Sequence, residues 1–415
     1  MITRGSINLL RLIINFFAPL ASVGLMIFGS AFYTTFLSVF LDSEGYTRGE
    51  IGYVHAAFFL GMLLGAFQME KLIKRVGHIQ ALAVFGSLAT SSTLLQALSQ
   101  TFLAWIFLRF LFGLSLAALY IVIESWMLGH STPKTRGVIL SLYMICLYAS
   151  QSASQQVLSF VDIHSFTPFL VSALFTSLSV IPVGLSTSRI TLPPSHEPIG
   201  FFRIIKLSPF GVSGCFISGL LLSALYSFFP ILAVSKGIPS ANLMSVTIAG
   251  GVILQWPIGK FSDYFERRKT LLVMVIMTLC LTLMGYLYGE ASSTQVLSLS
   301  FLIGGFSFTL YPLCITQVCD HLHHSNITTA TALLLIAYGF GSVLGPVASS
   351  MVVDAFGINS LFLYFAALLA ILAGIGAYTT MRRPIIPLED QTEFQPLTNV
   401  SSVAYEMDPR SENGE

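Results

Sequence analysis

The sequence predicts an all-α membrane protein in which 12 transmembrane helices form two pseudo-symmetric six-helix bundles. Three observations lead to this fold class: an apolar composition with few charges, a succession of long apolar stretches, and a residue pattern that recurs in both halves of the chain. The first identifies the solvent, the second gives the number of helices, and the third divides the chain into halves.

The composition indicates that the membrane is the solvent of this chain. The 415 residues are 54% hydrophobic and only 9% charged, with a mean hydropathy of +0.80. A soluble domain carries about 25% charged residues, so the composition excludes both an ordinary soluble enzyme and a disordered protein. The formal net charge of +1 excludes the strongly basic surface of a nucleic-acid binder. We therefore expect contact with membrane lipid and none with nucleic acid.

Twelve long apolar stretches follow one another along the sequence. A spanning helix closes its backbone hydrogen bonds internally and needs about 20 apolar residues to cross the hydrocarbon. The first stretch is too long for the core of a signal peptide and is interpreted as a retained helix. The stretches cover residues 15–41, 50–70, 79–99, 103–128, 137–161, 166–187, 207–235, 241–262, 270–289, 294–319, 327–354 and 359–381.

The basic residues predict the orientation of these helices. If the N-terminus is cytoplasmic, 17 of the 20 Lys and Arg residues fall in cytoplasmic segments. Arg48 and Lys236 fall outside, and Arg109 lies within the fourth helix. Short loops on the cytoplasmic side of membrane proteins carry such an excess of basic residues. We therefore predict a multi-pass protein of the cytoplasmic (inner) membrane with both termini in the cytoplasm.

A repeat of residues divides the chain into two halves. Gly113 and Tyr120 in the fourth helix correspond to Gly304 and Tyr311 in the tenth, at an offset of 191 residues. Small residues one helical turn apart allow helices to approach closely. Two such small residues of the fifth helix, Ser150 and Ser154, correspond at the same offset to Gly341 and Gly345 of the eleventh.

The domain boundaries follow from this repeat and from the polar segments around it. We predict a cytoplasmic N-terminus over residues 1–14, a first bundle over 15–187 and a second over 207–381. Pro193, Pro194 and Pro198 interrupt helix formation, so residues 188–206 are predicted to be a cytoplasmic linker. The segment 382–415 is polar and net acidic, which predicts a disordered cytoplasmic tail.

Several short motifs resemble those of a known family. The segment 259–269 reads Gly-Lys-Phe-Ser-Asp-Tyr-Phe-Glu-Arg-Arg-Lys, with a Gly, an Asp and paired basic residues. In the equivalent loop of the first half, Glu70 stands in place of the Gly and Lys74 in place of the Asp. An Arg followed four residues later by Gly occurs in the fourth helix, and a Gly-Pro motif occurs over residues 341–346.

These motifs resemble the major facilitator superfamily of secondary transporters over about residues 10–383. The segments around Glu124, Arg136 and Gln255 resemble in particular a bacterial branch whose substrates are unassigned. The resemblance implies a secondary active transporter that moves a small organic solute by alternating access, with the bundles rocking about a central site. The sequence contains no Gly-x-x-x-x-Gly-Lys-Ser/Thr loop, so we expect an ion gradient, that of the proton, to drive transport rather than ATP.

Arg109 is the ionisable residue that stands out within the spans. Its insertion costs about 2.5–3.5 kcal/mol on the translocon scale, and such residues usually face a partner or a water-filled cavity. Arg109, Gly113, Tyr120 and Glu124 lie within roughly 60° of one another in helical projection, on a stripe about 22 Å long. This stripe suits a transport pathway. A structural role, in which Arg109 bonds backbone carbonyls or reaches the interface, is the alternative.

Charged residues near the cytoplasmic helix ends predict a gate. Glu124 lies near the cytoplasmic end of the fourth helix and Arg136 stands at the start of the fifth, which predicts an ion pair between the two that closes the inner side. Asp263 with Arg267 and Arg268 allows the same interpretation, because carboxylate and guanidinium groups pair well. A solvated cluster of positive charge is the alternative for this loop.

Other polar or small residues in the spans join Arg109 as candidates. Aromatic residues in spans are usually packing or interface anchors, so a contact with substrate is one of two interpretations. The pathway candidates are Arg109, Tyr120, Tyr33, Tyr143, Gln151, Tyr226, Gln255, Tyr311, Gln317 and Tyr338. The residues predicted to allow close helix packing are Gly61, Gly65, Gly113, Gly341, Gly345 and Pro346.

The remaining expectations concern function classes and partners. No His-Glu-x-x-His or Gly-x-Ser-x-Gly motif occurs, so we do not expect an enzyme. The mostly neutral spans favour a neutral, amphipathic or anionic solute, with a monomer as the transport unit. A sensor that keeps the transporter fold without moving solute is the alternative function. We expect no cofactor and no metal, although Asp320, His321, His323 and His324 are close in sequence.

Overall fold

The computed structural model describes residues 9–99, 101–185, 201–287, 292–322, 327–382, 387–401, 403–408 and 410. Every regular element within these ranges is a helix, and 12 of the helices are long and apolar enough to cross a membrane. The predicted fold class is therefore confirmed. Residues 1–8 of the predicted N-terminus and 188–200 of the predicted linker lie outside the described residues, as do residues 186–187 at the end of the predicted first bundle.

The helices follow the predicted stretches closely. The six spans of the first half are α2 (Phe17–Ser43), α3 (Arg48–Val76), α4 (His78–Leu98), α5 (Phe102–His130), α6 (Pro133–Val157) and the pair α7 (Thr167–Leu178) and α8 (Val180–Gly184). Those of the second half are α10 (Pro209–Ser235), α11 (Ser240–Tyr264), α12 (Arg267–Leu287), α13 (Ser293–Cys319), α14 (Ile327–Phe356) and α15 (Leu361–Arg382). Short helices α1 (Leu9–Asn15) and α9 (Phe201–Leu207) precede each half.

Local residues explain where helices begin and end. The Thr47 side chain accepts a hydrogen bond from the Glu50 backbone, and the Glu50 side chain accepts one from the Thr47 backbone, which starts α3 with a capping box. At its other end α3 continues past the predicted boundary at residue 70 as far as Val76, where Gly77 with a φ of 96° ends it. Lys74 pairs with Glu70 at 2.6 Å on the surface of this last part. Gly45 and Gly237 have φ values of 83° and 67° in equivalent turns after the first helix of each half.

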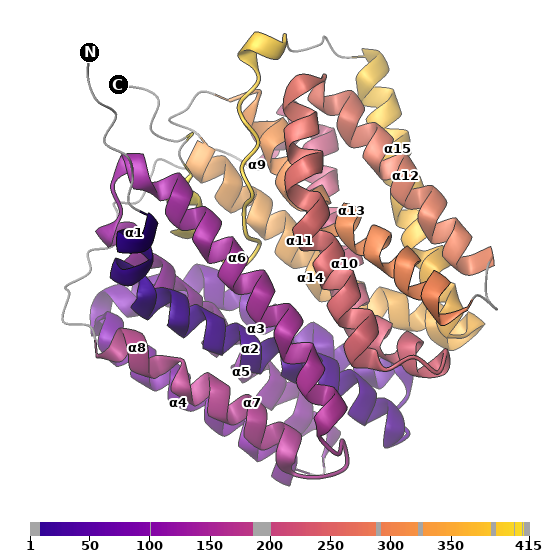
Figure 1. Cartoon of the computed structure of the whole chain (residues 1–415). Coiled ribbons are helices and arrows are strands. Elements are labelled where there is room, and N and C mark those ends of the chain that lie inside the picture. Colours follow the sequence, from indigo (N-terminus) through magenta and orange to yellow (C-terminus); the bar gives the residue numbers. More distant parts are fainter. Residues whose placement is uncertain are drawn as a thin grey trace.

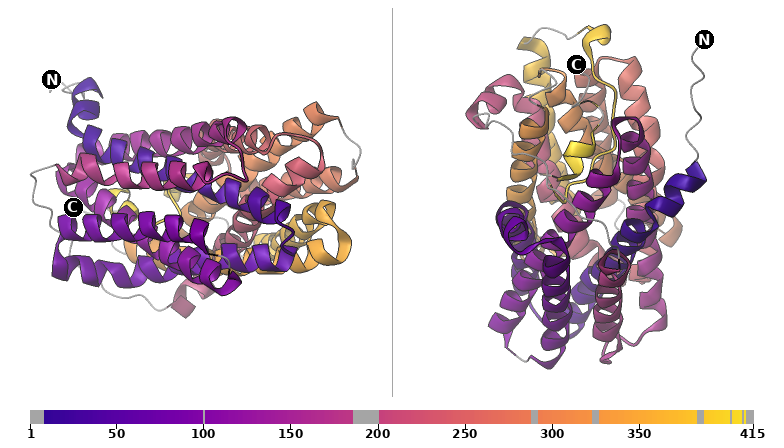
Figure 2. Two further views of the ribbon diagram at one scale, coloured as in Figure 1. Left: turned by 90° about the horizontal axis from the view of Figure 1, so that it is seen from below. Right: turned by 90° about the vertical axis from the view of Figure 1, so that its left-hand side faces the viewer.

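The spans form two groups that lie side by side. Figure 1 shows the indigo-to-magenta helices of the first half next to the pink-to-yellow helices of the second, and both views of Figure 2 agree. Because the spans alternate in direction, α2 begins and α15 ends on the same face of the molecule. We call this face the terminal face. The other face, where α2 ends and α3 begins, is called the opposite face.

The repeat in the sequence appears again in the packing. A Cβ atom at Gly113 would lie 2.1 Å from the carbonyl oxygen of Phe58, and one at Gly304 would lie 2.0 Å from that of Thr247. Both glycines therefore allow equivalent helix pairs, α3 with α5 and α11 with α13, to touch through their backbones. The other predicted packing glycines also lie where a Cβ would meet a neighbouring helix within 3 Å: Gly61, Gly65, Gly341 and Gly345.

The two halves meet at the opposite face. The Gly49 backbone of α3 donates to Asp354 of α14 at 3.1 Å, and Gln156 of α6 donates to Ser245 of α11 at 2.8 Å. Gly52 packs so closely on the Pro346 carbonyl that a Cβ would lie 2.8 Å from it. These contacts close this face of the molecule.

The C-terminal segment differs from the predicted disordered tail. It leaves the terminal face after α15 and returns between the halves, where it includes the short helices η4 (Leu388–Asp390) and η5 (Val403–Met407). Figure 2, right, shows this yellow segment between the purple and orange helices. Phe394, Leu397 and Tyr405 are buried there. The prediction of disorder rested on the acidic composition and did not consider these few apolar side chains. They are buried against apolar residues of the two halves only in the folded molecule.

Candidate functional site

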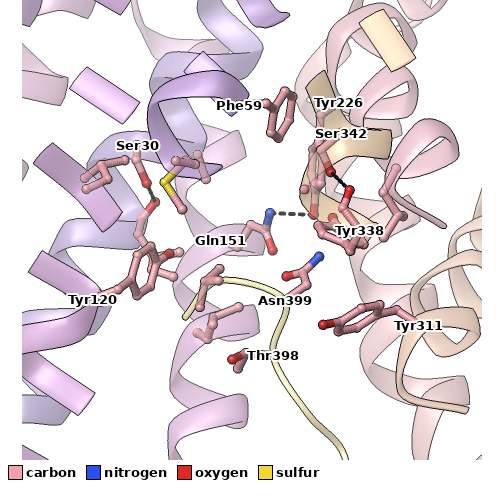
Figure 3. A pocket seen from close by; sticks show the side chains of 18 of the residues that line it. Ser30, Phe59, Tyr120, Gln151, Tyr226, Tyr311, Tyr338, Ser342, Thr398 and Asn399 are labelled. Carbon is pink, nitrogen blue, oxygen red and sulfur yellow. Dashed lines mark hydrogen bonds between the residues drawn. The ribbon is translucent and has the colours of Figure 1, made fainter. Parts of the chain in front are cut away.

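A cavity lies at the centre of the molecule, between the two halves. The first half contributes α2, α3, α5 and α6 to its wall, and the second contributes α10, α13 and α14. Leu397, Thr398, Asn399 and Val400 of the C-terminal segment complete the wall. The volume left free is about 170 Å³. Figure 3 shows polar side chains from both halves pointing into this space.

Five of the ten predicted pathway residues line this cavity. Tyr120 and Tyr311, which correspond in the repeat, face it from opposite halves. The Gln151 amide of α6 donates a hydrogen bond of 2.8 Å to the Tyr226 hydroxyl of α10. Tyr338 stands beside Tyr311, with 4.8 Å between the ring centroids. The repeat and the polar positions thus converge on one site.

Other lining residues were not among the predicted pathway residues. Tyr148 and Gln155 of α6 line the cavity together with Gln151, from which they are three and four residues away. This helical spacing places all three on one face, so periodicity could have identified them. Phe308 packs edge-on against Tyr148 and Tyr226, at centroid distances of 6.0 and 5.8 Å. No comparable signal marked the lining residues of the C-terminal segment.

Arg109 lies one layer behind the cavity wall. Its side chain is fully buried, and Nη2 donates a 2.8 Å hydrogen bond to the Thr34 hydroxyl. The guanidinium carbon stands 4.9, 4.4 and 5.3 Å from the ring centroids of Tyr33, Phe58 and Phe112. Three aromatic faces stabilise the cation. Thr34 and Phe58 themselves line the cavity, so Arg109 supports its wall without touching its interior.

The other predicted pathway residues lie away from the cavity lining. The Tyr33 hydroxyl donates to Gln96 at 2.6 Å, and the Tyr143 hydroxyl donates to Glu124 at 2.5 Å. The Gln317 side chain accepts a 2.7 Å hydrogen bond from Ser208, the residue that caps α10. Gln255 is buried in α11 but is not among the lining residues.

The charged loop between α11 and α12 forms a buried cluster at the terminal face. Arg267 donates to Asp263 at 2.7 Å and to Asp320 at 2.6 Å, and its side chain is almost completely buried. Arg268 is also buried and donates to the Thr379 carbonyl of α15 at 3.3 Å. The solvated alternative therefore fits neither arginine. Burial raises the pKa of Asp320, an effect that the neighbouring Arg267 and Thr392 oppose.

Glu124 and Arg136 face different partners in this conformation. The Glu124 carboxylate accepts from Tyr143, and Ser401 and Ala404 of the C-terminal segment approach it. Arg136 lies close enough to Glu406 for the charges to interact. The ion pair predicted between Glu124 and Arg136 would form in a conformation whose terminal face is closed, and it stays a prediction.

Asp320 serves the ion-pair cluster rather than a metal site in this structure. Among the described residues no group of three or more His, Cys, Asp or Glu side chains is arranged to hold a metal ion. His323 and His324 lie outside the described residues.

Two similar bundles around a central polar cavity that is closed at one face are the architecture of a membrane transporter. The chain belongs to the Major Facilitator Superfamily, whose family model matches residues 20–323 and 213–403. It is therefore a multi-pass integral membrane transporter and not an enzyme.

Curated relatives are similar over most of the chain. The uncharacterized MFS-type transporter YcaD of Shigella flexneri is 27% identical over 355 residues, which are 84% of this chain and 91% of the relative. The uncharacterized MFS-type transporter Ent638_1421 of Enterobacter sp. (strain 638) is 28% identical over 348 residues, 81% of this chain and 88% of the relative.

Solved structures share the fold at low sequence identity. The nucleoside transporter NupG superposes with a TM-score of 0.72 at 14% identity, over 91% of this chain and 100% of that one. A bacterial homologue of the human lysosomal transporter Spinster, in an inward-facing and unoccupied conformation, gives a TM-score of 0.72 at 14% identity, over 94% and 99%. A D-xylose–proton symporter gives 0.69 at 13% identity, over 91% and 99%.

Proposed function

We propose that this protein is a secondary active transporter that moves a small organic solute by alternating access, driven by the proton gradient. One observation carries the proposal: both halves contribute polar side chains to a central cavity whose walls meet at the opposite face. A rocking motion that closes the terminal face and separates Gly49 from Asp354 would expose the same cavity to the other side.

The cavity lining favours an uncharged solute. Among the described residues that line it there is no Lys, Arg, Asp, Glu or His. Its polar groups are tyrosine hydroxyls, glutamine amides and small hydroxyl side chains set among aromatic and aliphatic residues. Apolar walls with a few fixed polar groups bind solutes by shape and hydrogen bonding. We therefore propose a neutral solute with hydroxyl or amide groups on an apolar or aromatic body.

Glu124 is our candidate for the coupling proton. Its carboxylate is fully buried inside α5, one turn from the cavity-lining Tyr120. Buried intramembrane carboxylates are costly when charged, and they commonly mark proton pathways. A proton taken up at the terminal face would neutralise Glu124 and lower the cost of enclosing it. The similarity to a proton symporter in fold agrees with this proposal without identifying the ion.

The terminal face is proposed to be cytoplasmic in the inner membrane of a bacterium. The excess of Lys and Arg in the loops at this face supports the orientation, and the curated relatives are bacterial. Reporter fusions to the loops on either side of α2 would test it, and an active periplasmic reporter at the terminal face would contradict it.

Ligand screening followed by flux measurement tests the proposed function. Neutral metabolites are first ranked by the rise they cause in the melting temperature of the purified full chain. The best binder is then offered in radiolabelled form to proteoliposomes, with and without an imposed pH gradient. We expect accumulation that requires the gradient. Binding without flux would instead identify a sensor that has kept the transporter fold.

A further inference from the structure

The C-terminal segment occupies the cavity that the solute would need. Residues 397–400 form part of the cavity wall, and the segment continues between the halves as far as Arg410. With the segment in place about 170 Å³ remains free, whereas small-molecule sites usually offer roughly 300–1,000 Å³. Figure 3 shows Asn399 at the centre of the cavity, next to Gln151. The segment therefore takes the place of a ligand.

The charged cluster at the terminal face binds the backbone where this segment turns inward. The Thr392 carbonyl accepts from Arg267 at 2.6 Å, and both the amide and the hydroxyl of Thr392 donate to Asp320 at 2.9 Å. The Phe394 amide donates to Asp263 at 2.8 Å. Arg267, Asp263 and Asp320 thus hold two residues of the segment, Thr392 and Phe394.

Gly259, the first residue of the same motif, receives the Phe394 ring. A Cβ atom at position 259 would lie 2.1 Å from that ring, so only glycine leaves the space that Phe394 fills. The ring is almost completely buried there. Backbone hydrogen bonds and ring packing therefore fix the segment at the mouth of the cavity.

A second anchor lies deeper and reaches both halves. The Tyr405 hydroxyl contacts the Tyr311 hydroxyl of α13, and Arg410 donates to Thr316 of the same helix at 3.2 Å. Arg410 also forms hydrogen bonds of 2.6 and 3.0 Å to Asp408, which balances its buried charge. On the other side, the segment faces Glu124 of α5.

We propose that the segment made up of residues 392–401, 403–408 and 410 forms a tethered plug that inhibits transport by occupying the cavity and holding the terminal face open. The inference rests on the proposed function, because a plug inhibits only a molecule that alternates. The chain must withdraw the segment before the two halves can close over a solute at this face. Release of the segment thus controls whether the transport cycle can proceed.

A matched pair of leucines in the full-length chain allows a direct test. Leu397 is 2% exposed in the cavity, whereas Leu388 is 54% exposed in the same segment. Leu397→Ser removes buried apolar surface and should release the segment, whereas Leu388→Ser should not. Ala404→Cys, in a chain whose five native cysteines are replaced, reports release through its reaction rate with a water-soluble maleimide, because Ala404 is fully buried.

The expected result is slow labelling of the introduced thiol at position 404 in the parent chain and in Leu388→Ser. Labelling should be at least about tenfold faster in Leu397→Ser, the factor that corresponds to burying one leucine. Fast labelling in the parent would show that the segment is not docked in the cavity and would overturn the proposal. Thr392→Pro provides a second variant, since it removes the amide and hydroxyl that donate to Asp320 while every residue of the two bundles stays unchanged.

A distance measurement tests the inhibition separately. Spin labels at Arg75 of α3 and Lys269 of α12, both exposed at the terminal face, report the separation of the halves. In Leu397→Ser and Thr392→Pro we expect a new population with a shorter distance, absent from the parent and from Leu388→Ser. A docked segment whose release leaves all distances unchanged would refute the inhibitory role. If that population appears but no solute flux is found for any chain, the proposed transport fails and the conformational role of the segment remains.

Discussion

The Gln151 amide and the Tyr226 hydroxyl share a 2.8 Å hydrogen bond that joins α6 to α10 across the central cavity. The bond links one half of the molecule to the other at the level where a solute would bind. Both residues must therefore change partners when the halves move or when a solute with its own polar groups arrives. This makes the pair the most direct test of the site.

Tyr226→Phe should weaken solute binding by about two- to tenfold, which corresponds to the loss of one net hydrogen bond. Gln151→Leu should have a similar effect, and the double variant should be little worse than either single variant because both remove the same contact. Binding is measured by titration of the best stabilising solute. Tyr53→Phe, at a half-exposed tyrosine of α3, is the matched control. Fully additive losses would show that the two residues act independently.

Glu124→Gln should abolish uptake driven by a pH gradient but preserve exchange of labelled for unlabelled solute. The glutamine keeps an acceptor for the Tyr143 hydroxyl but carries no titratable proton. Both activities are measured in the same proteoliposomes. Glu50→Gln is the control, because glutamine also completes the capping box at the start of α3. Gradient-driven accumulation by Glu124→Gln would remove this residue from the coupling mechanism.

Arg109→Ala should reduce transport by more than tenfold while the protein remains expressed and folded. The substitution leaves three aromatic faces and the Thr34 hydroxyl without their cation, directly behind the cavity wall. Arg109→Lys keeps the charge but not the planar group, so we expect intermediate flux. Flux and melting temperature are measured together. A large fall in melting temperature with unchanged flux in the folded fraction would assign Arg109 a purely structural role.

Docking of the C-terminal segment should weaken as the pH rises from 6 to 8. Burial and the nearby Glu70 raise the pKa of Glu406 to about 7, against the opposing effect of Arg136 and Lys74. A group whose pKa is higher in the docked state favours docking when protonated, and this contribution is lost as the pH rises through about 7. The docking equilibrium should change about tenfold over this interval.

The maleimide reaction of the thiol introduced by Ala404→Cys measures that equilibrium at each pH. Glu406→Gln should make labelling slower and reduce its dependence on pH over this range, after correction for ionisation of the thiol. Glu124, which also faces the segment, keeps its own contribution. Glu393→Gln, at an exposed position of the same segment, should behave as the parent. A pH dependence that persists unchanged in Glu406→Gln would assign the effect to another group.

The fold could be predicted from the sequence because the bilayer imposes a strong local rule. Each span must satisfy its own backbone, so long apolar stretches identify α2 to α15 without knowledge of their neighbours. The repeat also identified Tyr120 and Tyr311, which line the central cavity from opposite halves. Helical projection was less informative for Arg109, because it assigns a residue to a stripe of α5 but cannot say which neighbouring rings enclose its side chain.

The C-terminal segment could not be predicted in the same way. Its residues form no long apolar stretch, and its short helix η5 is stabilised by contacts with α5, α6 and α14 rather than by its own sequence. The Tyr405 hydroxyl contacts the hydroxyl of Tyr311, which lies 94 positions earlier in the chain. Contacts of this kind depend on the complete tertiary structure, which composition does not contain.

One oxygen atom of Asp320 accepts hydrogen bonds from both Arg267 and the Thr392 amide. One oxygen atom of Asp263 likewise accepts from both Arg267 and the Phe394 amide. A molecule that captured Thr392 and Phe394 at the terminal face would therefore leave these oxygen atoms to Arg267 and release the segment. Such a molecule would accelerate turnover from outside the bilayer, without ever meeting the solute. The charged loop between α11 and α12 would then act as a receptor for a peptide of its own chain.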